Sequence, residues 1–385
     1  MKRVLIAHQS TIPHYRVPFY NTLERLRPSD WDFKVVFDPK ELVTPIFFKE
    51  KLHPSDIHFP IQEVNTICFP LLATFFSYQT FWRQISEFDM VILENAVNNL
   101  TYPLSHLHKL NGTKIVYWGH GKHRAIEKAS HLKSLSEQLK LFLVRLSDGF
   151  FAYTQGVADY LISQGIQSDK IFVLNNTIDI LKQRAAYQVT LPFRDVIRRK
   201  YHLEDKNVLL FVGRFSSNKR IDFLLQSFEI LNKIDSRYHL VLIGDGGEVY
   251  KNHFKLSSNL SYLGVFTSLE EIAPLYTASD LFVIPGLIGL APLQAMCYDL
   301  PIVTVDLPGH GPEIEYLSSN NSIILDTDTT PEKFALEVHN LFCEPNRLEN
   351  LKSCVWPSIK HLTIENMAEN FIRGVNYIFN IQNRS

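Results

Sequence analysis

The sequence lacks cysteine-rich motifs, long apolar runs and an excess of charge of either sign. Its 385 residues include only four cysteines, Cys68, Cys297, Cys343 and Cys354, and no two of them form a CxxC pair. This scarcity argues against a disulfide framework or a zinc site and is typical of a protein in a reducing compartment. No apolar run approaches the roughly 18 residues that a membrane-spanning helix needs.

The charge balance is nearly neutral. The chain has 39 basic and 40 acidic residues and a net charge of -1, so no basic field points to nucleic acid as a partner. The amino-terminal MKRVLIAHQS has a short apolar run that ends at His8 and Gln9, and we interpret it as a first strand rather than a secretory leader. We therefore expect a cytoplasmic protein.

Short apolar runs alternate with helical patterns along the whole chain. Runs without internal alternation, flanked by helices, are typical of parallel strands that are buried on both faces. We expect strands at Arg3–Ala7, Phe33–Phe37, Met90–Leu93, Lys114–Trp118, Gly149–Tyr153 and Ile171–Leu174, and then at Val208–Val212, His239–Ile243, Leu260–Leu263, Leu281–Ile284, Pro301–Val305 and Ser322–Leu325. The pattern predicts an α/β protein with two Rossmann-like, doubly wound domains.

The expected domain boundary lies in a charged, weakly periodic stretch from Ile180 to Asp205. The first domain is predicted to span residues 1–185 and the second residues 186–362. The basic cluster of this stretch is interpreted as the solvated face of a short helix, in preference to a phosphate or membrane site; its members are Arg194, Arg198, Arg199 and Lys200. A helical pattern from Thr363 to Ile381 carries one apolar face, so this last helix packs against another element.

The segment LLFVGRFSSNKRID, from Leu209 to Asp222, carries the most specific chemistry. It combines a buried strand, a turn at Gly213 and two cations, Arg214 and Lys219. Ligands of open α/β sheets bind at the carboxyl ends of the strands, and arginine and lysine both bind phosphate oxygens there. The pattern favours a diphosphate site; the alternative is a surface turn with two solvated cations.

Several segments in order resemble retaining glycosyltransferases of the family 4 type, which have two Rossmann-like domains in the GT-B fold. They are FVGRF with NKR around Arg214 and Lys219, VLIGDGGE at Val241–Glu248, YLGVFTSLEEIAPLYTASDLFVIPG from Tyr262 onward, and LNNTIDI at Leu174–Ile180. The resemblance covers nearly the whole chain. It implies an interdomain cleft, a hinge near residues 180–205, and a final helix (363–385) that packs back on the first domain.

The resemblance also implies roles for residues of the second domain. Arg214 and Lys219 would stabilise the leaving diphosphate. Donor-binding residues are implied at Gly213, Gly244, Gly286, Gly289, Leu290, Gln294 and Glu313. Family members usually carry glutamate where this chain has Gly286 and Gln294, and this variant loop resembles a subgroup associated with bacterial surface polysaccharides. Gln294 can still hydrogen-bond a ribose diol, whereas Glu313 either anchors the donor or caps a helix.

In the first domain, the family places a histidine close to the transferred sugar at the position of His120, which follows a strand in WGHG. The loop after the first strand, HQSTIPHYRVPFY, approaches the donor and the acceptor in these enzymes, which implicates His14, Tyr15 and Arg16. For Arg16, a surface cap is the alternative. Glu94 and Asn95 are weaker candidates. The acidic pair Asp326 and Asp328 is not interpreted as a metal site; Asp328 to Thr330 is interpreted as an N-cap, with Pro331 at the first helical position.

The function implied is a hexosyltransferase-type glycosyltransferase that moves a sugar, with retention, from a nucleotide-sugar donor to a glycan or lipid-linked acceptor in polysaccharide assembly. The two cations would replace a metal, so no cofactor is expected. Two alternatives stay open: a catalytically silent nucleotide- or glycan-binding partner in an assembly complex, and a sugar-nucleotide epimerase of the same fold.

A basic amphipathic pattern lies at Leu132–Leu146, after four basic residues at Lys122, His123, Arg124 and Lys128. Such a helix can lie on an anionic membrane surface. We therefore expect peripheral contact with the inner face of the membrane; the alternative is an ordinary domain helix with a wet face.

Overall fold

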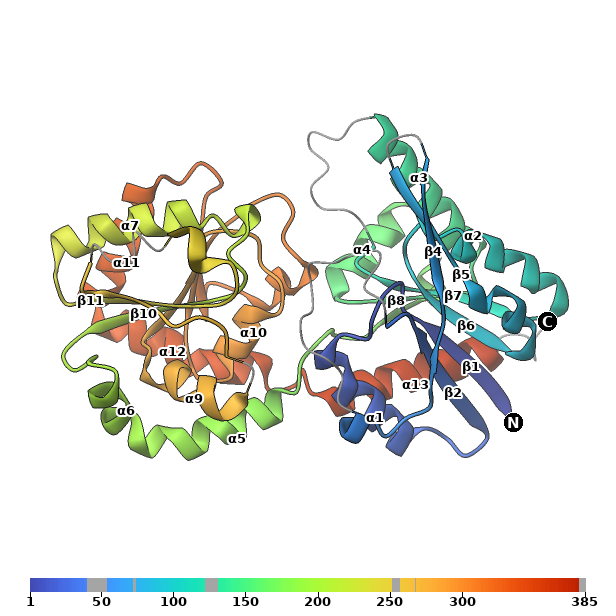
Figure 1. The fold of residues 1–385 in the computed structure, drawn as a ribbon, viewed down its shortest axis with the longest axis horizontal. Coiled ribbons are helices and arrows are strands. Elements are labelled where there is room, and N and C mark those ends of the chain that lie inside the picture. The colour runs from blue at the N-terminus through green and yellow to red at the C-terminus, as the bar shows by residue number, and fades with distance from the viewer. Residues whose placement is uncertain (40–53, 72–73, 122–130, 251–256, 267, 381–385) are drawn as a thin grey trace. The chain divides into compact units, whose positions relative to one another are not determined.

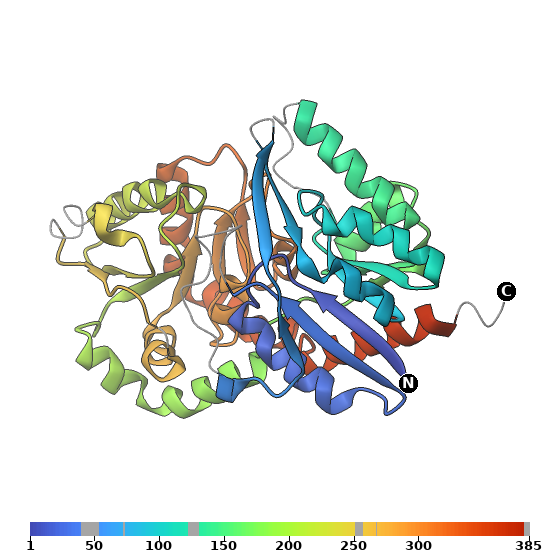
Figure 2. The same ribbon diagram turned by 45° about the vertical axis from the view of Figure 1, so that its right-hand side comes forward.

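The structure is a computed structural model that describes residues 1–39, 54–71, 74–121, 131–250, 257–266 and 268–380. The chain forms two compact units (Figures 1 and 2), one of residues 1–178 together with 364–385, the other of residues 179–363. Each unit is built on a parallel sheet, which confirms the predicted α/β class with two Rossmann-like domains.

The first unit contains a seven-stranded parallel sheet in the order β3-β2-β1-β6-β7-β8-β9. Its strands are β1 (Lys2–Ala7), β2 (Trp31–Phe37), β3 (Ile61–Glu63), β6 (Met90–Glu94), β7 (Lys114–Gly119), β8 (Gly149–Ala152) and β9 (Ile171–Val173). Six of them were predicted. The edge strand β3 and the antiparallel hairpin β4 (Thr66–Leu71) and β5 (Thr74–Gln79) were not, because β3 is short and half-polar and the hairpin lies outside the parallel sheet.

Helices cover both faces of this sheet, because alternate strand residues enter two separate cores. In β1, Val4 and Ile6 enter one core, while Leu5 and Ala7 enter the other. The first core is closed by α1 (Val17–Leu26) and α13 (Ile364–Asn380); the second is closed by α2 (Thr101–Ser105), α3 (His131–Leu146) and α4 (Gln155–Ser163).

The second unit contains a six-stranded parallel sheet in the order β12-β11-β10-β13-β14-β15. Its strands are β10 (Asn207–Val212), β11 (Tyr238–Ile243), β12 (Leu260–Tyr262), β13 (Leu281–Ile284), β14 (Ile302–Val305) and β15 (Ser322–Leu325). All six were predicted to within one residue at each end. The sheet runs outward in both directions from β10 and β13, so its topological switch point lies between these two strands.

The helices of the second unit are α5 (Ile180–Thr190), α6 (Arg194–Lys200), α7 (Ile221–Ile234), α9 (Leu269–Ala278), α10 (Ala291–Met296), α11 (Pro331–Cys343) and α12 (Pro345–Ile359). Helix α11 begins behind an N-cap at Thr330, whose side chain accepts a hydrogen bond from the Lys333 amide, so the helix cap expected after Asp328 is present. Short 3-10 helices lie at His14–Arg16, Pro54–Asp56, Thr80–Glu87, His106–Asn111, Ser168–Lys170, Leu191–Phe193, Ser217–Lys219, Gly247–Tyr250 and Pro312–Tyr316.

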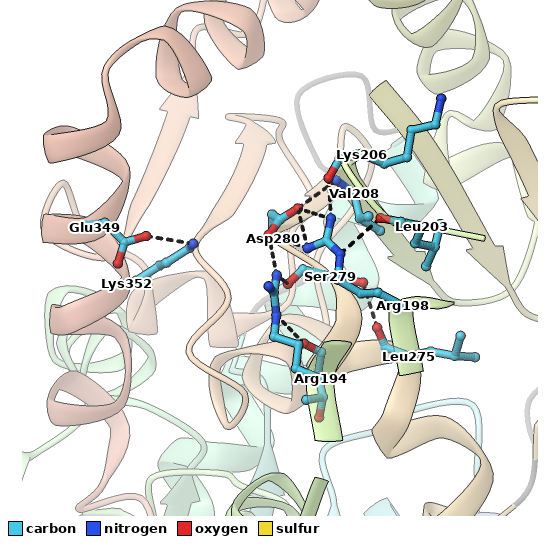
Figure 3. A network of polar contacts seen from close by, with 11 residues as sticks. Arg194, Arg198, Leu203, Lys206, Val208, Leu275, Ser279, Asp280, Glu349 and Lys352 are labelled. Atoms are coloured by element: carbon cyan, nitrogen blue, oxygen red, sulfur yellow. Dashed lines mark hydrogen bonds and ion pairs between the residues drawn. The ribbon is translucent and has the colours of Figure 1, made fainter. Parts of the chain in front are cut away.

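The basic cluster on α6 corrects one prediction (Figure 3). Arg194 pairs with Asp280 at 2.5 Å between Nη2 and Oδ1, and Arg198 pairs with the same carboxylate at 3.3 Å. The Val208 amide donates to the other Asp280 oxygen at 2.8 Å. Asp280 therefore ties α6 to β10 and β13, and Arg194 and Arg198 are not a solvated face, whereas Arg199 is exposed as expected.

The expected boundary at residue 185 falls inside α5, which belongs to the second unit. Arg184 on this helix pairs with Asp299 at 2.8 Å and donates to the Cys297 carbonyl at 3.1 Å. Thr190 at its end shares a 2.5 Å hydrogen bond with Thr277 of α9. Because these contacts are local to one unit, residues 180–200 form a packed pair of helices and not a free linker.

Helix α13 brings the end of the chain into the core of the first unit. Its apolar residues Met367, Phe371, Val375 and Ile378 are all buried there. The Phe371 ring stacks on Phe151 of β8 with centroids 4.7 Å apart. The sheet of the first unit is thus covered by a helix that follows the whole second unit in sequence.

Replacing Phe371 by Ala should therefore destabilise the first unit by about 3–5 kcal/mol, because the change removes a fully buried ring and leaves a cavity. Denaturant unfolding followed by a first-unit probe would measure it. Tyr377→Ala, on the same helix at a half-exposed position, should cost about 1 kcal/mol or less. Equal losses in the two variants would show that the side of α13 that carries Phe371 is not its packing face.

Candidate functional site

Two loops meet at the switch point of the second unit. β10 and β13 pair in parallel, so the loop after β10 and the loop after β13 leave the sheet side by side. The Leu287 amide donates to the Asn218 carbonyl at 2.8 Å, and the Lys219 ammonium donates to the Leu287 carbonyl. The structure therefore brings together two segments that the sequence analysis assigned to one diphosphate site.

Gly286 is required at this contact for steric reasons. A Cβ atom added there would lie 2.4 Å from the Asn218 carbonyl oxygen and 2.4 Å from the Lys219 Cα. Both are backbone atoms that cannot turn aside. A glutamate at this position would not fit without a shift of one of the two loops.

Gly244 plays a similar part on the other side of the β10 loop. Its φ is +146°, and an added Cβ would lie 1.9 Å from the Gly213 carbonyl oxygen. The Gly213 amide donates to the Ile243 carbonyl at 2.9 Å, and the Phe215 amide donates to the Asp245 carbonyl at 2.8 Å. The backbone on both sides of Arg214 is thereby fixed, and the Arg214 side chain is partly buried.

Lys219 has a strongly lowered pKa. Burial lowers its pKa to about 8, although the nearby Glu313 carboxylate acts in the opposite direction. Glu313 is buried within the 3-10 helix Pro312–Tyr316, whose preceding residue Gly311 donates to the Ile288 carbonyl at 2.8 Å. A lysine with so low a pKa is half-neutral near pH 8, and a bound anion would restore its charge.

His310 joins a third loop to the loop that follows β13, a contact that was not predicted from the sequence. Its Nδ1 accepts a hydrogen bond from the Ile288 amide at 2.9 Å. The loop that follows β14 is thereby held against the loop that follows β13. The signal was available in sequence, because His310 stands in GHGPE after a predicted strand, next to the glutamate that was singled out.

The remaining predicted donor residues lie on the β13 loop and α10. No atom lies within 4 Å of a Cβ added at Gly289, so this position is open, and Leu290 is the N-cap of α10. Gln294 on α10 donates to the Gln183 side chain over 3.4 Å. Helix α10 has only six residues with Pro292 in its first turn, so it offers few amides to an anion.

In the first unit, His120 is exposed directly after β7, where its ring lies 4.4 Å from the Tyr153 ring. His14 is exposed and Tyr15 is partly buried in the 3-10 helix that follows β1. Tyr153, at the end of β8, was not among the predicted site residues. Its ring contacts the imidazole of His120, which was among the predicted site residues.

Arg16 is not the surface cap that was the alternative for this residue, because its side chain is fully buried. The guanidinium lies 4.8 Å from the Trp118 ring centroid and 5.2 Å from each of the Tyr15 and Tyr153 ring centroids. Its Nη1 lies 3.6 Å from the Met367 sulfur of α13. Aromatic faces stabilise such a cation through their quadrupoles, so Arg16 binds the ends of β7 and β8 to α13 rather than presenting a free charge.

A histidine–carboxylate pair lies at the ends of β1 and β6. His8 Nδ1 lies 2.9 Å from the Glu94 carboxylate, whose other oxygen accepts the Gln9 amide at 3.1 Å. Burial alone would raise the pKa of Glu94, but the hydrogen bond from His8, the Gln9 amide and the Arg16 charge together lower it. Glu94 was a weaker candidate, and His8 was missed although it directly follows the first strand.

No group of three or more His, Cys, Asp or Glu residues in the described ranges could hold a metal ion. The basic residues Lys122, His123, Arg124 and Lys128 lie outside the described residues. In the part of the chain that the structure describes, no helix combines the length and apolarity of a membrane-spanning segment.

Residues 206–344, which contain the meeting loops, match the family described as glycosyl transferases group 1. This segment of the second unit is similar to that family. Spore coat protein SA of Bacillus subtilis is 29% identical over 175 residues, which cover 41% of this chain and 45% of that protein. Mannosylfructose-phosphate synthase of Agrobacterium fabrum is 24% identical over 241 residues, which cover 58% of this chain and 48% of that protein. The chain thus spans about half the length of the curated relatives it matches.

The crystal structure of Anabaena Alr3699/HepE in complex with UDP is similar in fold. The two structures align over 98% of this chain and 100% of the Anabaena chain, with a TM-score of 0.71 and 15% sequence identity. The same Anabaena protein has been solved in complex with UDP-glucose. These likenesses show a GT-B architecture of two Rossmann-like domains.

Gly286→Ala should reduce the free energy of unfolding of the second unit by about 1–3 kcal/mol, because the new methyl group would press on the backbone of residues 218 and 219. UDP binding by calorimetry should weaken as well, since Lys219 would shift. Gly289→Ala is the matched control, at an open position of the same loop, and should change stability by no more than about 0.5 kcal/mol. Similar effects of the two changes would mean that the loops do not touch.

The lowered pKa of Lys219 predicts that ligand affinity and the free energy of unfolding change in opposite directions with pH. Because its free pKa is about 8, UDP affinity should fall as pH rises above 8, by at most about tenfold per pH unit. In the unfolded chain Lys219 has a higher pKa, so above pH 8 the unfolded state binds more protons than the folded state. The free energy of unfolding should therefore rise with pH above 8. Calorimetry and denaturant titration from pH 7 to pH 10 would measure both. Lys219→Met should remove the two trends; wild-type trends that survive in this variant would assign them to other groups.

Proposed function

We propose that the protein is a glycosyltransferase that transfers a sugar from a uridine-diphosphate donor to a glycan or lipid-linked acceptor. The observation that carries the proposal is the partly buried Lys219, which lies where the β10 and β13 loops meet and belongs to the same loop as Arg214. A buried ammonium is costly unless an anion compensates it. A diphosphate at the switch point of the sheet would supply that compensation.

Arg214 and Lys219 would act on the leaving group. Transfer breaks the bond between the sugar and the diphosphate, and negative charge grows on the phosphate oxygen. Fixed donors that face such charge commonly lower a barrier by several kcal/mol each, about 3 kcal/mol being typical. With two cations in place, the reaction as proposed needs no metal ion.

Uridine is the proposed base because the Anabaena neighbour binds UDP and UDP-glucose. We assign the contacts to the transferred sugar and to the acceptor to residues of the first unit. His120, exposed on the Tyr153 ring, would hydrogen-bond a hydroxyl of the transferred sugar, and His14 and Tyr15 would contact the acceptor. Retention of configuration, a place in surface polysaccharide assembly and contact with the membrane are proposed from the family resemblance.

A catalytically silent binding partner is the second candidate. Gly286 and Gln294 stand where related enzymes carry glutamates, and the Gln294 amide is already hydrogen-bonded to Gln183. A protein with these changes could keep a nucleotide site and lose turnover. Slow hydrolysis of a UDP-sugar that is abolished in His120→Ala would contradict this candidate.

The test of donor binding is a thermal-shift series with UDP, GDP and their sugar conjugates. UDP or a UDP-sugar should stabilise the wild-type protein. Arg214→Ala should weaken UDP binding by about tenfold to a hundredfold, because a charge-assisted hydrogen bond contributes about 1.5–3 kcal/mol.

Arg237→Ala is the control for that series. Arg237 is an exposed arginine of the same unit, paired with Asp235 at 2.6 Å, and its loss should leave the shift intact. Absence of stabilisation by every nucleotide and nucleotide sugar would overturn the proposal.

A further inference from the structure

Helix α10 carries a single polar side chain, that of Gln294, which is partly exposed. The helix follows the β13 loop directly, and the Leu287 carbonyl of that loop accepts a hydrogen bond from Lys219. The buried residues of α10 are Pro292, Leu293, Ala295 and Met296. A ligand held at the carboxyl ends of β10 and β13 therefore meets one carboxamide on this helix.

The Gln294 carboxamide is oriented by a second glutamine. Gln183 Oε1, on α5, accepts from Gln294 Nε2 over 3.4 Å and from the Tyr298 hydroxyl at 3.0 Å. A carbonyl oxygen has two lone pairs, so it can accept both hydrogen bonds at once. Because the Gln294 nitrogen is engaged with Gln183, the planar carboxamide turns its oxygen to the other side. Within the described part of the chain, no donor hydrogen-bonds to that oxygen.

Tyr298 is held rigidly. It is 2% exposed, and its ring stacks on Tyr276 of α9 with centroids 4.8 Å apart. The Tyr187 ring of α5 meets it edge-on at 5.5 Å, and α5 packs against both α9 and α10 (Figure 1). A buried hydroxyl needs a hydrogen-bond partner, and for Tyr298 that partner is Gln183.

The backbone that carries Gln183 is fixed as well. Its neighbour Arg184 pairs with Asp299 at 2.8 Å and donates to the Cys297 carbonyl at 3.1 Å. These contacts tie α5 to the residues on both sides of Tyr298. All of these groups belong to the second unit.

We infer that Gln183 and Tyr298 are positioning residues that present Gln294 to the donor as a hydrogen-bond acceptor, so that the site selects a nucleotide with ribose hydroxyl groups. A hydroxyl donates to the Gln294 oxygen, whereas a deoxyribose leaves that oxygen unpaired. The inference rests on the proposed function, in which first-unit residues contact the transferred sugar and α10 is left the nucleoside end of the diphosphate. Neither Gln183 nor Tyr298 was among the predicted site residues.

The test compares the dissociation constants of UDP and 2′,3′-dideoxy-UDP by calorimetry, and the readout is their ratio. The wild-type protein should bind UDP at least about tenfold more tightly than the analogue, because the analogue leaves a polar group unpaired. Gln183→Met removes the acceptor that orients Gln294, and Tyr298→Phe removes the donor that orients Gln183. Each variant should reduce the ratio to about threefold or less.

Gln183→Glu tests the direction of the hydrogen bonds. A glutamate keeps oxygen acceptors for Tyr298 and for Gln294 Nε2, so the ratio should stay within about twofold of the wild-type value. The added charge acts on both nucleotides alike and cancels in the ratio. If Gln183 instead donated to Gln294, this variant would lose the ratio as Gln183→Met does, and the inference would be wrong.

Tyr276→Phe is the matched control. The buried Tyr276 hydroxyl has no hydrogen-bond partner among the residues that the structure describes, so its removal should leave the ratio unchanged. A merely structural role of Gln183 and Tyr298 would weaken both nucleotides equally in their variants, and that result would overturn the inference. Failure of UDP to bind the wild-type protein would overturn the proposed function as well, whereas UDP binding with a wild-type ratio near one would overturn the inference alone.

Discussion

The close approach of the β10 and β13 loops is the constraint on which the candidate donor site depends. Adjacent parallel strands deliver both loops to one edge of the sheet, and the hydrogen bond from Leu287 to Asn218 fixes their separation. Gly286 makes that separation attainable, since any side chain there would collide with the backbone of residues 218 and 219. Lys219 is held in a partly buried position as a result, and burial lowers its pKa.

This constraint also explains the unusual chemistry of the donor loop. A glutamate at position 286 would supply a carboxylate but would force the loops apart. With glycine there, Glu313 is the carboxylate whose charge acts on Lys219. The balance of charge then favours an anionic ligand, while hydrogen bonds to a sugar must come from backbone groups or from other side chains. This charge balance is consistent with the diphosphate site that we propose.

The sequence predicted the parts of the fold that local pattern determines. Strands buried on both faces are continuous apolar runs, so all six strands of the second sheet were found. The hairpin β4–β5 is apolar as well, but Pro70 lies within its first strand and its two strands are not separated by a helical pattern. Partners distant in sequence carry no local signal: Arg194 and Asp280 are 86 residues apart, and Arg16 and Met367 are 351 residues apart. The loops of the candidate site were identified because glycines and cations follow strands, but their mutual contact was not.

The Arg16–Met367 contact has a consequence for how the first unit forms. The guanidinium lies against the rings of both Trp118 and Tyr153, and α13 supplies the sulfur next to it. Tyr153 in turn supports the exposed ring of His120. The His120 environment is therefore coupled, through Tyr153 and Arg16, to a helix that begins only after residue 363. Since Phe371 and Val375 of that helix complete the core, the first unit cannot reach its final packing until nearly the whole chain is available, although most of its residues come first.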